Sequence, residues 1–74
     1  MIKSFDETFR GWGGIDRHGR EYGFEGFSIE AAQKKAADIS AEMNNVRGIL
    51  QINVSLEKMP NGNYAVHNRS TYET

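Results

Sequence analysis

The sequence predicts an α+β fold in which one α-helix packs on one face of an antiparallel sheet of about four strands, in the order ββαββ. A stripe of apolar residues at helical spacing fills the middle of the chain, at about 29–44. Strand-like runs around a turn flank it on each side, at about 8–27 and 46–72. We expect residues 1–74 to form a single domain, and residues 2–6 could add a fifth, short edge strand.

The first predicted hairpin, about 8–27, is centred on the turn Asp-Arg-His-Gly at residues 16–19. Asp at the first position and Gly at the fourth are typical of a type I turn. The preferred register pairs Asp16 with Arg20, and it also sets three further pairs opposite each other: Gly14 and Tyr22, Trp12 and Phe24, Phe9 and Phe27. A register shifted by one residue would place each aromatic ring over a glycine and stays open as the alternative. The run Gly-Trp-Gly-Gly at 11–14 is expected to bend or bulge its strand.

The predicted helix, about 29–44, begins after Ser28, whose hydroxyl can accept a hydrogen bond from a free N–H of the first turn. Glu30 places negative charge near the positive end of the helix dipole. Asn44 and Asn45 are expected to end the helix, because Asn tolerates the left-handed conformation. One apolar stripe should face the sheet: Ile29, Ala32, Ala36, Ile39 and Met43.

The second predicted hairpin, about 46–72, turns at Met-Pro-Asn-Gly, residues 59–62. Its first strand has an apolar residue at every second position and should bury that face: Leu50, Ile52, Val54 and Leu56. The turn predicts the pairs Leu56–Val66, Val54–Asn68, Ile52–Ser70 and Leu50–Tyr72. The opposite face should be exposed to solvent: Gln51, Asn53, Ser55, His67, Arg69 and Thr71.

The expected core combines the helix stripe, the apolar face of the second hairpin and aromatic residues of the first. Beyond the residues above it includes Val66, Tyr22, Phe24 and either Phe9 or Trp12. Trp12 has a second interpretation as an exposed anchor for a partner, because Trp and Arg are favoured at the centres of interfaces.

Composition excludes several classes of function. The chain has no Cys, which excludes disulfide scaffolds and Cys-based zinc sites. Nine Lys and Arg against ten Asp and Glu leave a net charge of −1, which argues against a dedicated polycation for nucleic acid. No apolar run is long enough to span a membrane, and the first residues lack the apolar region of a signal peptide. We therefore expect a soluble cytoplasmic protein.

The chain contains no motif of a known catalytic or metal site. His18 and His67 are its only histidines, and neither lies at a metal-binding spacing from a second ligand. No nucleophile elbow or phosphate-binding loop is present, since the Gly-rich run at 11–14 precedes no helix. We expect no enzyme activity, no catalytic residues, no metal and no cofactor.

Basic residues and one tryptophan are the candidates for contact with a partner: Arg10, Trp12, Arg17, His18, Arg20, Lys34, Lys35 and Arg69. They would bind a protein, or they would contact the phosphates of a nucleic acid. Acidic residues are interleaved with them, so the first interpretation is preferred. A sheet edge could also join two copies, which leaves both monomer and homodimer open.

The pattern at 24–43 resembles that of a known group of proteins. A strand ending Phe-Glu-Gly-Phe at 24–27 runs directly into the Ser28-capped, Ala-rich helix, and a hairpin follows. This resembles small phage-encoded anti-CRISPR proteins, especially inhibitors of type I surveillance complexes. The resemblance implies a non-enzymatic phage anti-defence protein in the bacterial cytoplasm, which binds a Cas complex and blocks its DNA binding. The net charge of −1 differs from that of strongly acidic DNA mimics.

Overall fold

The computed structural model describes residues 1–74 and confirms an α+β fold with one helix and antiparallel strands. The elements in chain order are β1 (Ile2–Ser4), β2 (Glu7–Phe9), β3 (Gly14–Ile15), β4 (Glu21–Tyr22), α1 (Ile29–Asn44), β5 (Ile49–Gln51), β6 (Val54–Lys58), β7 (Tyr64–Asn68) and β8 (Thr71–Glu73). They form three small sheets, with the strand orders β1-β8-β5, β2-β7-β6 and β3-β4. The prediction of one four- or five-stranded sheet is therefore wrong.

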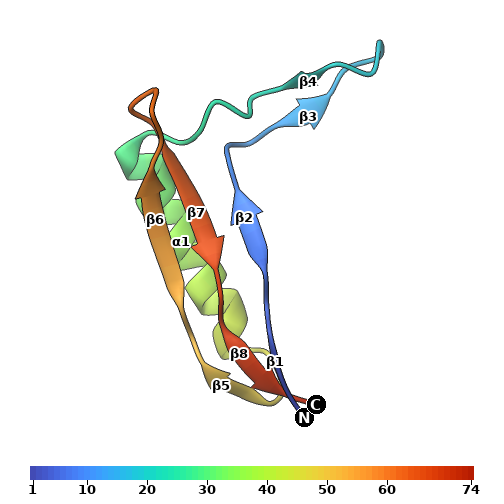
Figure 1. Ribbon diagram of the computed structural model, residues 1–74, viewed down its shortest axis with the longest axis vertical. Helices are drawn as coiled ribbons and strands as arrows, with labels where there is room; N and C mark the ends of the chain where they lie inside the picture. Colours follow the sequence, from blue (N-terminus) through green and yellow to red (C-terminus); the bar gives the residue numbers. More distant parts are fainter.

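The C-terminal segment of β7 and β8 is central in both three-stranded sheets (Figure 1). The N-terminal segment of β1 and β2 lies on one side of it, and β5 and β6, which follow the helix, lie on the other. The N-terminal strand keeps a single register against it, from Ile2 opposite Glu73 to Phe9 opposite Val66. The two sheets are therefore successive segments of one layer. The predicted pairing of Phe9 with Phe27 is wrong, because the buried Val66 offers Phe9 a place against the core.

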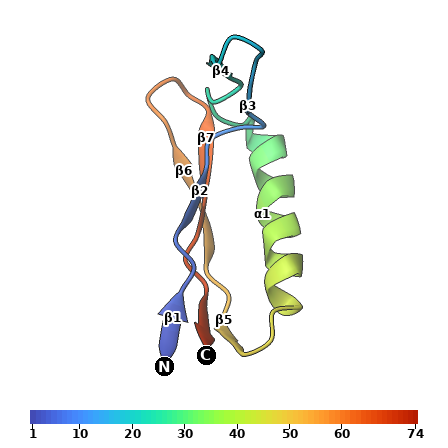
Figure 2. The same ribbon diagram turned by 90° about the vertical axis from the view of Figure 1, so that its right-hand side faces the viewer.

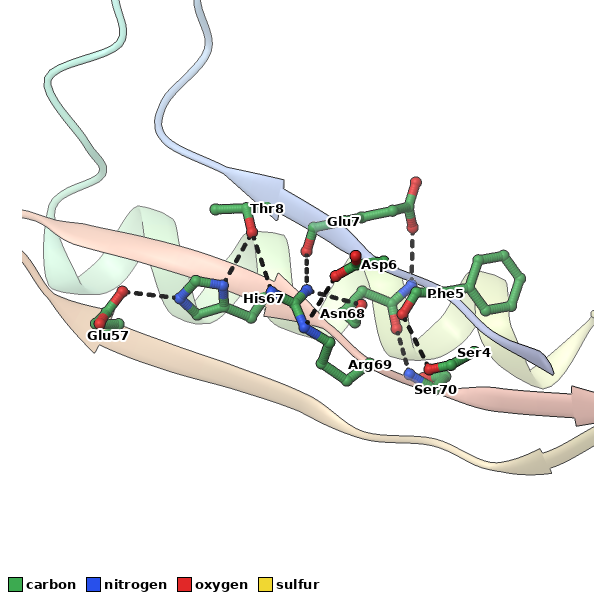
Figure 3. Close-up of polar contacts among 10 residues, drawn as sticks. All are labelled: Ser4, Phe5, Asp6, Glu7, Thr8, Glu57, His67, Asn68, Arg69 and Ser70. Carbon is green, nitrogen blue, oxygen red and sulfur yellow. Dashed lines mark hydrogen bonds and ion pairs between the residues drawn. The ribbon is translucent and has the colours of Figure 1, made fainter.

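A buried polar pair lies where the central strand breaks between β7 and β8. Asn68 and Ser70 are both fully buried. Asn68 Oδ1 accepts from the Ser70 N–H at 3.1 Å, and Asn68 Nδ2 donates to Glu7 Oε1 at 2.9 Å (Figure 3). Asn68 Nδ2 also donates to Met43 Sδ at 3.4 Å. Ser70 Oγ accepts from the Asn53 N–H at 3.0 Å. Side chains thus satisfy polar groups that have no ladder partner at the break.

Helix α1 spans the residues that its apolar stripe predicts. The Ser28 hydroxyl accepts from the N–H of Ala31 at 3.2 Å, which confirms the predicted N-cap. The helix ends at Asn44, but the predicted mechanism is wrong. Asn45 has a φ of −98°, and the left-handed residue that turns the chain toward β5 is Gly48, with a φ of 84°.

The core lies between α1 and one face of β2-β7-β6, and no element covers the opposite face (Figure 2). Its buried apolar members are Phe27, Ala32, Ile39, Met43 and Val66. Half-buried apolar side chains surround them: Phe5, Phe9, Ala31, Ala36, Val46, Ile49, Ile52, Val54, Leu56 and Tyr64. The expectation that Ile29 belongs to the core is wrong, since it lies at the exposed start of the helix.

The second hairpin forms with the predicted turn. The Gly62 N–H donates to Met59 O at 2.9 Å, and the Met59 N–H donates to Asn63 O at 2.7 Å. Two predicted pairs are confirmed, Leu56 with Val66 and Val54 with Asn68. This part of the register follows directly from the turn, as hairpin geometry requires.

On the N-terminal side of Asn53, the predicted register of the second hairpin fails. Ile49 pairs with Tyr72, and a β-bulge separates this pair from Gln51 opposite Thr71. Leu50 lies in the bulge and is 54% exposed, so its predicted burial and its pairing with Tyr72 are wrong. The first strand of the second hairpin begins at Ile49, the start of β5, rather than at about 46.

The predicted pair of Ile52 with Ser70 does not form either, because both residues lie in the break between strands. Ile52 is nevertheless half-buried against the core, and the predicted exposure of the opposite face is confirmed for Gln51, Asn53 and Ser55. The other residues predicted on that face are half-buried: His67, Arg69 and Thr71.

Replacing Asn68 should destabilise the protein strongly. Asn68→Ala leaves the buried N–H of Ser70 without an acceptor, and we expect a loss of about 1–3 kcal/mol in the free energy of unfolding. Asn53→Ala is the matched control, because that side chain is exposed, and it should change stability by less than about 0.5 kcal/mol. Urea unfolding followed by circular dichroism measures both, and equal losses would contradict the assignment.

Candidate functional site

Residues 10–26, called the arm below, leave the body of the protein as a long projection (Figure 1). Its tip has the preferred register, with Gly14 opposite Tyr22. The Asp16 N–H donates to Arg20 O at 2.9 Å, and the Asp16 carboxylate accepts from the backbone N–H groups of His18 and Arg20. The turn is therefore held by its first residue, as its sequence predicts.

The middle of the arm matches neither predicted register in full. No ladder pairs Trp12 with Phe24, so that prediction is wrong. The rings cover glycines instead: a Cβ at Gly13 would lie 2.4 Å from the Phe24 ring, and one at Gly14 would lie 2.6 Å from the Tyr22 hydroxyl. Only glycine allows the rings to lie this close to the strand.

The base of the arm is held by close backbone contacts. Gly11 has a φ of 122°, and a Cβ there would lie 2.1 Å from the carbonyl oxygen of Gly23. The Gly26 N–H donates to Arg10 O at 2.9 Å, and Phe27 then exchanges two 2.8 Å backbone hydrogen bonds with Tyr64. The chain leaves the central strand after Phe9 and rejoins it at Phe27.

Large apolar side chains are exposed along the whole arm: Trp12, Ile15, Tyr22 and Phe24. Trp12 is 62% exposed and Ile15 is 68% exposed. The predicted core positions of Trp12, Tyr22 and Phe24 are therefore wrong, whereas the alternative interpretation of Trp12 as an exposed residue agrees with the structure. So many exposed apolar side chains on one projection are typical of an interaction surface.

Trp12 is oriented by contacts at the base of the arm. Its ring packs edge-on against Phe27, with the ring centres 5.0 Å apart. Lys35 Nζ lies 4.6 Å from the centre of the Phe9 ring and 5.4 Å from that of Trp12. Such cation–π contacts attract the ammonium group to the aromatic rings. Trp12 and Lys35, far apart in the sequence, thus form one surface.

A depression of about 370 Å³ adjoins this surface. It is lined by Thr8, Phe9, Arg10, Gly11 and Phe24. Two aromatic residues and one arginine are therefore among the residues that line a space of the size of a large side chain.

The remaining predicted site residues lie in three other places. Arg17, His18 and Arg20 are at the arm tip, where Arg20 Nε is 3.4 Å from an Asp16 carboxylate oxygen. Lys34 is exposed on α1. Arg69 lies on the open face of the sheet, so the eight candidate residues do not form one site.

Polar side chains form a continuous network on the open face of the sheet (Figure 3). Glu57 Oε1 lies 2.9 Å from His67 Nε2, and His67 Nδ1 lies 3.1 Å from Thr8 Oγ1. Arg69 donates to the Glu7 carbonyl oxygen at 2.8 Å and to Thr8 Oγ1 at 3.4 Å. These groups satisfy one another across β2, β7 and β6, and the network thereby links the three strands.

Ile15, Glu57 and Thr8 are not among the residues predicted for a site. The predicted turn places Ile15 opposite Glu21, which leaves the isoleucine without an apolar partner, and this was a readable signal. The second hairpin likewise places Glu57 and His67 on one face. Thr8 could not be found in this way, because its strand pairs with the distant C-terminal strand.

Comparison with known proteins identifies no relative. No family model, curated protein or solved structure matches the chain. Helix α1 is too short and too polar to cross a membrane, and no group of three or more His, Asp or Glu side chains is placed to hold a metal ion. The geometry of the arm and of the depression therefore carries the functional argument.

Gly11→Ala should destabilise the attachment of the arm. The new Cβ would overlap the Gly23 carbonyl oxygen at a positive φ, and we expect a cost of at least about 1–3 kcal/mol. Gly19→Ala, also at a positive φ but with nothing within 4 Å, is the control and should cost about 1 kcal/mol. Thermal unfolding compares the two variants, and an equal loss would show that the close approach does not matter.

Trp12 fluorescence tests the exposure of the arm. Trp12 is the only tryptophan, and because it is mostly exposed, acrylamide should quench its emission nearly as well in the folded protein as in urea. Strong protection of the folded protein would contradict the exposed position.

Proposed function

We propose that this protein is a non-enzymatic binding module that uses its arm to bind a partner protein. The observation that supports this most is the presence of four large exposed apolar side chains on a projection with a two-residue ladder at its tip. An isolated two-stranded hairpin is at best marginally stable in water. Full burial of a side chain such as Ile15 against a partner would contribute about 1.5–3 kcal/mol.

The arm also carries the polar groups that a specific interface needs. Arg17 and Arg20 lie at the tip, and Arg10 lies at the base, two residues before Trp12 in the sequence. Trp, Tyr and Arg are the residue types that contribute most to binding energy at interfaces. The arm therefore combines apolar anchors with cations over its whole length.

We further propose that the partner is a nucleic-acid-handling complex and that the protein is a phage anti-defence inhibitor of the anti-CRISPR type. The resemblance at 24–43 and the small α+β fold support this anti-CRISPR assignment. The net charge of −1 favours occlusion by contact over imitation of DNA.

A direct nucleic-acid-binding function is the second candidate. The observation that favours it is the surface at the base of the arm, where Lys35 lies over two aromatic rings and Arg10 is close in sequence to one of them. Aromatic rings beside cations can stack bases and contact phosphates. This candidate requires an affinity that falls steeply as salt concentration rises.

Co-migration with purified type I surveillance complexes on size exclusion, at two salt concentrations, tests the proposal. We expect a stoichiometric complex that survives high salt and no longer shifts target DNA on a native gel. Absence of co-migration with the complexes of every subtype would overturn the proposed anti-CRISPR function. Binding to free DNA or RNA alone, lost at high salt, would favour the second candidate.

Ile15→Ser should weaken binding to the partner by about tenfold or more, because the arm loses one buried apolar side chain. Leu50→Ser is the matched control, since Leu50 is a similarly exposed aliphatic residue on the body of the protein. Isothermal titration against the captured complex measures both affinities. An unchanged affinity for Ile15→Ser would remove the arm tip from the interface.

A further inference from the structure

One edge of β2 is free. Its other edge pairs with β7, and no strand lies beyond it. The Phe5 N–H donates to Ser70 O at 2.8 Å, and the register is unchanged from there to Phe9. Hydrogen-bonded and non-bonded pairs alternate along antiparallel strands. The backbone N–H and C=O of Glu7 and Phe9 therefore point toward β7, whereas those of Thr8 point away from it.

The depression described above lies at this free edge. Four consecutive residues, 8–11, line it together with Phe24 from the returning half of the arm. The half-buried Phe9 and the exposed Phe24 make the lining partly aromatic. An unpaired backbone beside an apolar depression is the arrangement by which sheet edges bind extended peptides.

Arg10 sets the charge of this site. Arg20 and Arg69 each form an ion pair, with Asp16 and Asp6 respectively, whereas Arg10 forms none. Its exposed guanidinium is available for a carboxylate of the partner, with a geometry that favours a bidentate contact.

We infer that this edge binds an extended segment of the partner protein in which an apolar residue is followed by an acidic one. The segment pairs with Thr8 as an added strand, places its apolar side chain between Phe9 and Phe24, and places its carboxylate on Arg10. This rests on the proposed function, because it names the chemistry of the segment that a partner protein presents.

Nuclear magnetic resonance titration of the intact protein tests this inference. The probe is a short end-capped peptide of Ser and Thr with a central Phe-Asp pair. We expect shifts of the backbone amides of residues 8–11 and an affinity on the order of 1 mM, since one apolar side chain and one ion pair carry the binding. A Phe-Lys peptide should bind about five- to tenfold more weakly. Methylation of the backbone nitrogen that faces Thr8 should abolish the shifts.

Arg10→Glu should reverse the preference toward the Phe-Lys peptide. Arg47→Glu is the matched control, because Arg47 is an exposed arginine without an ion pair, outside the arm and β2. Equal affinity of the wild-type protein for both peptides, or no shifts at residues 8–11 up to about 5 mM peptide, would overturn the inference. A concentration-dependent doubling of mass that Arg10→Glu removes would place a second copy at this edge and would also overturn it.

The two proposals can fail separately. If Ile15→Ser weakens capture of the partner while the peptides cause no shifts, the edge inference fails and the arm remains the binding element. If the peptides bind as expected but Ile15→Ser leaves capture unchanged, the edge remains and the arm tip is not part of the interface.

Discussion

The hydrogen bonds between Asn68, Ser70 and their neighbours are the constraint on which the rest of the fold depends. They lie inside the central strand, where both side chains are fully buried, and no buried side-chain polar atom of the protein is left without a partner. A buried amide strongly disfavours any arrangement that leaves it unpaired. The pair therefore requires Glu7 on one side and Asn53 on the other, and it thereby aligns both neighbouring strands with the central one.

The arm follows from this alignment. Phe9 and Phe27 both occupy positions beside β7, opposite Val66 and Tyr64. The two positions are near each other in space, so the chain between the two phenylalanines has no place in the layer and must project from it. Helix α1 already covers the apolar face of the sheet. The aromatic residues of the arm are thus exposed because the core is complete without them.

Local signals in the sequence predicted much of the local structure, and the largest failure, the pairing of the N-terminal strand with the last strand, is non-local. The Ser28 cap, the turn at 59–62 and the pair of Leu56 with Val66 depend on neighbours in sequence, and all three are confirmed. Pairing of the N-terminal strand with the last strand depends on loop closure over most of the chain, which no local pattern encodes. Trp12 and Lys35 were predicted as candidate residues one by one, but only that pairing brings them together.

The open face of the sheet and the arm differ in whether their polar side chains already have partners within the protein. On the open face, each group from Glu57 through His67 and Thr8 to Arg69 already has a partner in the same chain, so a second molecule would have to break hydrogen bonds to bind there. On the arm, rings and an unpaired guanidinium face water. Binding there removes apolar surface from water and breaks no internal hydrogen bond. The energetic asymmetry between these surfaces is therefore the physical reason for proposing the arm, rather than the sheet, as the binding surface.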